Sequence, residues 1–260
     1  MFINYFIGIF VLIFGICIGS FLNCVIYRLE QGKSLRGRSF CPHCKHALSW
    51  HDLFPVFSFI FLKGKCRYCN KRISIQYPLV ELATGILFVL VFNFLYPIST
   101  SYQLIYILYL FYIFSALVII FIYDLKHYLI PDKVLLPAII IALLYNSLTN
   151  PQNILNSLLA VAVASGFFLV IFLISNGKWM GFGDVKLAIL MGLVLGLSSV
   201  LVALFLAFFF GAIIGVALTT FRRKSLKSEI PFGPFLIIGT FIAMLWGEQI
   251  IQWYMHSFLI

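Results

Sequence analysis

The sequence predicts an all-α polytopic membrane protein of about eight transmembrane helices, with a small zinc-binding cytoplasmic loop domain after the first helix. Of its 260 residues, 63% are hydrophobic and 10% are charged, and the mean hydropathy is +1.08. Soluble domains carry about 25% charged residues. The charged residues also separate long uncharged runs, each long enough for a membrane helix of about 20 residues. These observations exclude a soluble globular domain.

The uncharged runs set the expected number of spans. Residues 1–27 are enough for one helix. Each of the runs 82–123, 134–177 and 187–221 is too long for one span and suits a hairpin of two, with turns expected at 97–101, 146–153 and 196–199. A last span begins at residue 230 and carries Glu248 near its end.

This topology places all 18 Lys and Arg on one side of the membrane. They lie in residues 28–72 and at Lys126, Lys133, Lys178, Lys186, Arg222, Arg223, Lys224 and Lys227. The positive-inside rule makes that side the cytoplasm and puts both termini outside. Membrane orientation therefore explains the net charge of +10 better than a nucleic-acid partner does.

The loop between the first two spans predicts a zinc site. Cys41-Pro42-His43-Cys44 and Cys66-Arg67-Tyr68-Cys69 form two CxxC pairs, a spacing typical of zinc. Four thiolates, Cys41, Cys44, Cys66 and Cys69, would close the tetrahedron, so we expect structural rather than catalytic zinc. We accordingly divide the chain into a first helix (1–27), a cytoplasmic tetracysteine zinc loop (28–77) and a seven-helix membrane domain (78–260).

Two carboxylates are the candidate catalytic residues. Asp124 ends the third predicted span and Asp184 begins the sixth, so the topology places both at the cytoplasmic face. Ionisable groups at such positions are costly and are functional candidates. Two carboxylates at one site cannot both ionise easily, so they would share a proton and could activate water against a peptide bond. Asp184 could instead cap the helix that follows it, and Asp132, after Pro131, resembles a helix-start residue.

Three further polar positions lie near the first two spans. Gly19 and Ser20 would allow close helix approach, and Asn23 could hydrogen-bond across helices. Glu81 could be functional, or it could cap its helix or pair with a basic loop residue. The sequence leaves these alternatives for Glu81 open.

The motifs together resemble a known family. Gly181-Phe182-Gly183-Asp184 matches the GxGD motif of membrane aspartyl proteases, and Tyr123-Asp124 with Ile130-Pro131-Asp132 resembles the other half of the bacterial prepilin peptidase site. Further matches lie in Gly19-Ser20-Phe21-Leu22-Asn23 with Tyr27-Arg28, the CxxC pairs, Tyr77-Pro78-Leu79-Val80-Glu81 and Pro231-Phe232-Gly233-Pro234. The resemblance covers essentially the whole chain.

The resemblance implies an aspartic endopeptidase of the bacterial inner membrane. Its members remove the short basic leader of type IV prepilins or pseudopilins at the cytoplasmic face, with Asp124 and Asp184 matching the catalytic pair. They then N-methylate the new N-terminus from S-adenosylmethionine. This second activity and its cofactor rest on the resemblance alone, because no glycine-rich cofactor loop is evident.

Three other interpretations explain less of the sequence. A presenilin-like protease would carry a Pro-Ala-Leu tripeptide near its C-terminus, and this chain has none. An ion-coupled transporter could use the acidic residues as a proton relay, but such relays lie near the bilayer midplane between repeats. An inactive zinc-loop scaffold would leave the aspartate pair unexplained.

Overall fold

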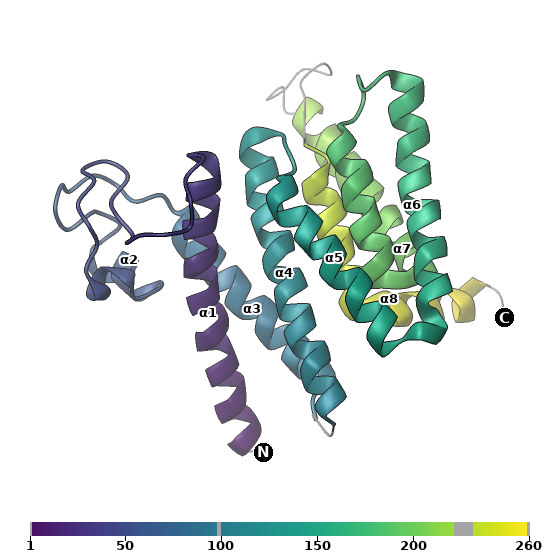
Figure 1. Ribbon diagram of the computed structural model, residues 1–260, viewed down its shortest axis with the longest axis horizontal. Coiled ribbons are helices and arrows are strands. Elements are labelled where there is room, and N and C mark those ends of the chain that lie inside the picture. Colours follow the sequence, from purple (N-terminus) through teal and green to yellow (C-terminus); the bar gives the residue numbers. More distant parts are fainter. Residues whose placement is uncertain (1, 98–99, 221–230, 259–260) are drawn as a thin grey trace. The chain divides into compact units, whose positions relative to one another are not determined.

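The structure is a computed structural model that describes residues 2–97, 100–220 and 231–258 (Figure 1). Within these residues the regular secondary structure is helical, apart from two isolated β-bridges. The α-helices are α1 (Phe2–Glu30), α2 (Phe57–Phe61), α3 (Gln76–Leu95), α4 (Ser101–His127), α5 (Asp132–Thr149), α6 (Ile154–Ser175), α7 (Phe182–Thr220) and α8 (Gly233–Phe258), with 3₁₀ turns η1 (Trp50–Leu53) and η2 (Pro151–Asn153). All except α2 are long and apolar enough to cross a membrane, so the predicted fold class is confirmed.

The chain forms two compact units, Met1–Ile119 and Ile120–Ile260. The first contains α1, α3, most of α4 and the loop that carries α2. The second contains the last turns of α4 together with α5, α6, α7 and α8. Both candidate catalytic aspartates therefore belong to the second unit, and all four candidate zinc ligands belong to the first.

In the first unit, α1 and α3 approach each other closely because small residues face the contact. A Cβ atom added at Gly19 would lie 2.7 Å from Cα of Glu81, and one added at Gly85 would lie 2.7 Å from Cγ1 of Ile16. The side-chain amide of Asn23 donates a 3.0 Å hydrogen bond to the carbonyl of Tyr77 across this contact. The expected close approach and cross-helix bond are both present.

In the second unit, α7 reverses direction at Gly196. Its first part runs antiparallel to α6, because the rings of Phe182 and Phe172 are 5.4 Å apart and a Cβ at Gly192 would lie 2.6 Å from the nitrogen of Val161. Farther along α7, the ring of Phe208 returns to within 5.8 Å of the ring of Phe167. A straight helix would have carried Phe208 beyond the start of α6, so the two parts of α7 form a hairpin.

The reversal depends on the backbone of Gly196, whose φ of 70° and ψ of 176° are not helical. Residues other than glycine seldom adopt a positive φ. The hairpin predicted for residues 187–221 therefore turns where the sequence placed its break. Because α7 contributes two helical segments, the seven helices in the described part of the chain that could cross the membrane give eight segments, the number that the uncharged runs predicted.

The other two predicted turns are also present. The α3 helix ends at Leu95 before α4 begins at Ser101, and α5 ends at Thr149 before α6 begins at Ile154. Residues 98–99 of the first turn lie outside the described residues, as does the basic group Arg222, Arg223, Lys224 and Lys227.

The backbone near Gly196 is bonded by side chains from the α5–α6 turn. The side-chain amide of Asn146 donates a 2.6 Å hydrogen bond to the carbonyl of Leu193, and a Cβ at Gly196 would lie 2.9 Å from Nδ2 of Asn156. With Asn150 and Asn153, these residues line a polar cavity of about 230 Å³. The cavity lies at the end of this unit that is opposite the aspartates.

The hairpin predicts on which side of the membrane three exposed positions lie. We expect a membrane-impermeant thiol reagent to label Ser198→Cys and Asn150→Cys from the same side of sealed membranes, and Lys126→Cys from the other. The reason is that the first part of α7 crosses the membrane, and the chain then turns at Gly196 and crosses back. The turn therefore lies on the side opposite the start of α7. The measurement is the labelling of each variant above that of the parent chain with its native cysteines. Labelling of Ser198→Cys only from the side that exposes Lys126→Cys would contradict the hairpin.

Candidate active site and metal centre

Asp124 lies in the last turn of α4 and is buried. The helix continues through Asp124 and ends before Tyr128, whose φ of 57° breaks the helical path. The carboxylate of Asp124 accepts a hydrogen bond from the backbone N–H of Gly233, the first residue of α8. The end of α4 and the start of α8 are therefore joined through this carboxylate.

Asp184 lies in the first turn of α7 and is also buried. Its carboxylate accepts a hydrogen bond from the backbone N–H of Gly181, the residue before the helix. An acidic residue at the third helical position commonly makes this bond to the residue that caps the helix. Asp184 thus does help to cap α7, as the alternative interpretation expected, but from inside the helix and beside a second acid.

The structure brings Asp124 and Asp184 together within the second unit, where the charge of Asp124 acts directly on Asp184. The packing around the pair leaves little room for side chains at two glycines. A Cβ at Gly233 would collide with Oδ2 of Asp124, and one at Gly183 would lie 3.1 Å from Cβ of Ile130. The GxGD segment, the residues before α5 and the start of α8 therefore converge on one acidic pair.

Asp132 has a different partner and a different setting. It is the first residue of α5, and both of its carboxylate oxygens lie 2.8 Å from Nζ of Lys186, in the first turn of α7. The Asp132 side chain is 51% exposed, in contrast to the buried pair. The ion pair joins the starts of α5 and α7. No pattern in the sequence indicated that Lys186 is the partner of Asp132.

The four candidate zinc ligands lie at the tips of two similar turns. In each turn the first cysteine, Cys41 or Cys66, donates its backbone N–H to the carbonyl five residues later and accepts from the N–H four residues later. The residue after the second cysteine, Lys45 or Asn70, has a φ near 60°. The two CxxC pairs therefore fold into matching turns that present their sulfurs to each other.

The sulfurs are close enough together to hold one metal ion. All four Sγ atoms lie within 4.8 Å of one another, and those of Cys41 and Cys69 are 3.9 Å apart. Thiolates about 2.3 Å from a tetrahedral zinc ion would be about 3.8 Å apart. The donor set and its spacing therefore fit zinc. Among the nearby histidines, the ring centroid of His46 lies 3.7 Å from that of Tyr68, and the ring centroid of His51 lies 3.7 Å from that of Trp50.

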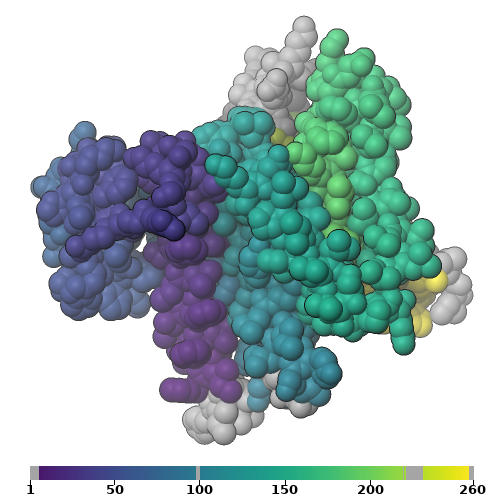
Figure 2. Space-filling model, viewed as in Figure 1, coloured from purple at the N-terminus to yellow at the C-terminus, as the bar shows by residue number. Residues whose placement is uncertain are grey.

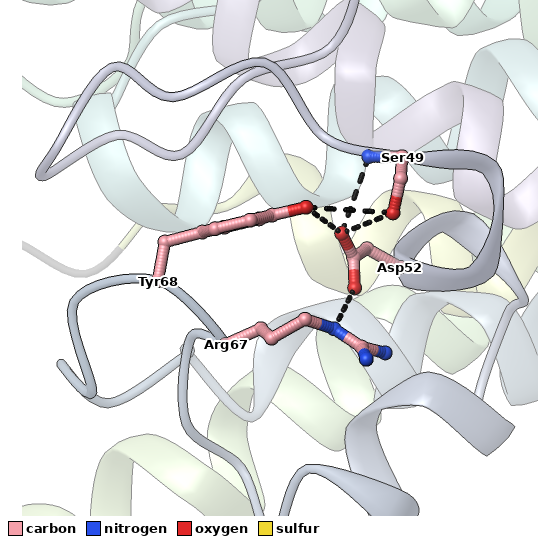
Figure 3. Close-up of polar contacts among 4 residues, drawn as sticks. All are labelled: Ser49, Asp52, Arg67 and Tyr68. Atoms are coloured by element: carbon pink, nitrogen blue, oxygen red, sulfur yellow. Dashed lines mark hydrogen bonds and ion pairs between the residues drawn. The ribbon is translucent and has the colours of Figure 1, made fainter.

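Asp52 joins the parts of the loop around the cysteines (Figure 3). Its carboxylate accepts hydrogen bonds from the backbone and hydroxyl of Ser49, from Nε of Arg67 at 2.8 Å and from the hydroxyl of Tyr68 at 3.0 Å. Arg67 and Tyr68 are the two residues between Cys66 and Cys69. Sequence reasoning missed this cluster, although Asp52 is the lone acidic residue within 31–77, a signal that it needs a basic partner.

The Asp52 cluster is electrostatically stable at neutral pH. Burial disfavours the charged form of the carboxyl, but the hydrogen bonds from Ser49, Arg67 and Tyr68 outweigh that effect and hold the pKa of Asp52 below its ordinary value. A carboxyl whose pKa is lowered by folding stabilises the fold above the unfolded pKa. That stabilisation decreases only as the pH falls through the lowered pKa of the folded state.

Glu81 connects the loop to the helices of the first unit. Its buried carboxylate accepts a 2.7 Å hydrogen bond from the backbone N–H of Val56 and another from the side chain of Ser20. Glu81 lies past the first turn of α3, which begins at Gln76, so it does not cap the helix. Its partners are thus the loop backbone and α1, rather than the basic side chain that one alternative expected.

Two models of known protein families match successive parts of this chain. Residues 13–95 match the model of the bacterial peptidase A24 N-terminal domain, and residues 111–216 match that of the type IV leader peptidase family. No solved structure matches the chain.

Several relatives carry the name prepilin leader peptidase/N-methyltransferase. That of Legionella pneumophila is 35% identical over 286 residues, which cover 97% of this chain and 96% of the relative. That of Bacillus subtilis (strain 168) is 33% identical, with 95% and 97% covered, and that of Aeromonas hydrophila is 33% identical, with 96% and 94% covered. This similarity over nearly the full length shows that the chain belongs to the type IV leader peptidase family.

Proposed function

We propose that this protein is a membrane aspartic endopeptidase that removes the short basic leader from type IV prepilins or pseudopilins, with Asp124 and Asp184 as its catalytic residues. The observation that carries the proposal is the buried pair itself, in which one carboxylate lies within electrostatic reach of the other. The family membership of the chain supports the same reaction.

In this mechanism the pair holds one proton. The ionised carboxylate takes a proton from a water molecule as the water oxygen attacks the scissile carbonyl carbon, while the protonated carboxyl polarises the carbonyl oxygen. The tetrahedral intermediate then breaks its C–N bond, and the leaving amine takes up a proton from the pair. The backbone N–H groups of Gly233 and Gly181 keep the two carboxylates in place throughout.

The reaction is proposed to occur at the cytoplasmic face of the bacterial inner membrane. Lys126 and Lys133 follow Asp124 closely, and Lys178 and Lys186 lie on either side of Asp184. Basic residues beside membrane helices favour the cytoplasmic side. A leader with basic residues would remain on that side for the same reason.

We further propose that Cys41, Cys44, Cys66 and Cys69 hold one structural zinc ion. Four thiolates complete the tetrahedron, so the metal would stabilise the loop 28–77 and leave hydrolysis to the domain formed by residues 78–260. The name of the relatives also includes an N-methyltransferase. We propose the same second activity here, with S-adenosylmethionine as methyl donor, on the strength of that relationship alone.

A transporter that uses the acidic residues as a proton relay is less consistent with these observations. Asp124 and Asp184 lie at helix ends and accept hydrogen bonds from helix starts, rather than forming a chain of acids along a path. The family relationship also favours proteolysis.

The two-aspartate mechanism predicts the effect of removing either acid. We expect Asp124→Asn and Asp184→Asn each to reduce leader removal by at least about 10²-fold, because an amide can neither hold nor release the shared proton. The double variant should be little worse than either single one, because the two residues act as a unit. The measurement is cleavage of a prepilin in membranes that contain matched amounts of each variant.

Asp132→Asn is the matched control for these variants. It removes a neighbouring carboxylate that is exposed and already paired with Lys186, so it should retain much of the activity. Substantial cleavage by Asp124→Asn or Asp184→Asn would contradict the mechanism. Loss of cleavage in Asp132→Asn alone would identify Asp132 as the true partner.

Gly233→Ala should impair cleavage through the position of Asp124. The added methyl would occupy the space of Oδ2 of Asp124, so the carboxylate must move. Small displacements of a catalytic group can cost about 10²-fold in rate. The matched control is Gly166→Ala in α6, where an added Cβ meets nothing within 4 Å. Equal cleavage rates for the two variants at equal expression would show that the close approach at Gly233 has no catalytic importance.

The zinc proposal predicts one metal ion per chain. Cys41→Ser should lose the metal and make the loop more sensitive to proteolysis, because the loop has little apolar core of its own. Cys17→Ser, a change at an exposed thiol in α1, should keep the metal. The measurement is the zinc content of each purified variant together with limited proteolysis. A purified, active parent protein without zinc would refute the site.

A further inference from the structure

The short helix α2 exposes a row of large apolar side chains. Phe57, Ile60 and Phe61 are 61%, 62% and 81% exposed. Their spacing of three and four residues places them on one face of the helix. Phe59 points elsewhere, because its ring packs against Gly64. A loop surrounded by water would bury such a group, and an exposed apolar patch commonly marks an interaction site.

The depth of α2 relative to α1 and α3 indicates what covers this face. Val56, directly before α2, donates its N–H to Glu81 of α3, and Glu81 also bonds Ser20 of α1. Ser20 precedes Arg28 by two turns of α1, so α2 lies roughly 12 Å below the level of Arg28 at a rise of 1.5 Å per residue. In Figures 1 and 2 the loop that contains α2 accordingly lies beside α1 rather than beyond its end.

Arg28 marks the level at which this unit leaves the apolar layer. Its buried guanidinium donates hydrogen bonds to the carbonyls of Ser34, Arg36 and Gly37, so the first part of the loop is held at the end of α1. Below that level, exposed apolar side chains lie beside Glu81. Leu79 and Leu82, on either side of Glu81 in α3, are 57% and 39% exposed, as expected for side chains that face lipid.

Charge also favours a lipid surface. Two exposed lysines, Lys63 and Lys65, follow α2 directly, and the loop is strongly basic. Amphipathic segments with aromatic residues on one face and basic residues nearby bind at the boundary between headgroups and acyl chains. Long basic side chains there reach the headgroups, which attract them when the lipids are anionic.

We propose that α2 is an interfacial anchor that inserts Phe57, Ile60 and Phe61 into the bilayer leaflet surrounding the end of α1 and the start of α3. Glu81 sets its depth by holding the backbone of Val56. The anchor fixes the cysteine-containing part of the loop against the membrane, because Phe61 is separated from Cys66 by a single tight turn. This inference depends on α1 and α3 spanning the membrane and is independent of the proposed catalysis.

The test is photo-crosslinking from single positions in the full chain. Benzoylphenylalanine replaces Phe61, or Phe57 in a second variant, and the protein is reconstituted in vesicles of phosphatidylethanolamine and phosphatidylglycerol. The matched control carries the same group at Leu35, which is 56% exposed but lies between two residues whose carbonyls Arg28 holds at the end of α1. The elution and melting profiles of each variant establish that it has folded.

We expect lipid adducts at position 61, identified by mass spectrometry, to be several-fold more abundant than at position 35, and the same at position 57. Equal lipid labelling at positions 61 and 35 would overturn the proposal. So would adducts at position 61 to a protein, whether a second copy of this chain or an added prepilin, in place of lipid. The first result would place α2 in water, and the second would make it a protein-binding surface.

Discussion

The second unit depends on the burial of two carboxylates beside each other. Removing a charge from water is costly unless hydrogen bonds and opposite charge compensate for it. Here the compensation comes from helix starts, since Asp184 accepts from the N–H that precedes α7 and Asp124 from the first N–H of α8. Helix N-termini carry a partial positive charge and suit anions. The end of α4 and the starts of α7 and α8 must therefore lie together.

Charged side chains also organise the first unit, but there each one binds the backbone of the loop between α1 and α3. Arg28 donates to carbonyls just after α1, and Glu81 accepts from the N–H of Val56. Asp52 joins Ser49 to the turn that contains Cys66. A loop of this size has too little apolar core to fix its own path. Specific polar contacts, together with four converging thiols, take the place of that core.

The parts of this structure that could be predicted from sequence are those governed by local rules. Run lengths predicted the spans and the turn at Gly196, CxxC spacing predicted the convergence of Cys41 and Cys69, and topology predicted that Asp124 would lie near Asp184. The partners of Asp132, Asp52 and Glu81 were missed or left open. The decisive partners, Lys186, Arg67 and Val56, lie at least fifteen residues away along the chain, where no local pattern indicates the contact.

The first segment of the α7 hairpin is short for a membrane span, and the asparagines at its turn explain how that length is sufficient. This segment, from Phe182 to Gly196, spans only roughly 20 Å at 1.5 Å per residue, less than the ~30 Å apolar core of a bilayer. An irregular backbone is tolerated at membrane depth only where protein or water satisfies its polar groups. Asn146 bonds the carbonyl of Leu193, and the asparagine-lined cavity provides a polar surface beside the turn. These polar groups extend inward from the turn at Gly196, so the first segment of α7 has a shorter apolar distance to cross. Asp184, at its other end, can therefore stay at the membrane face.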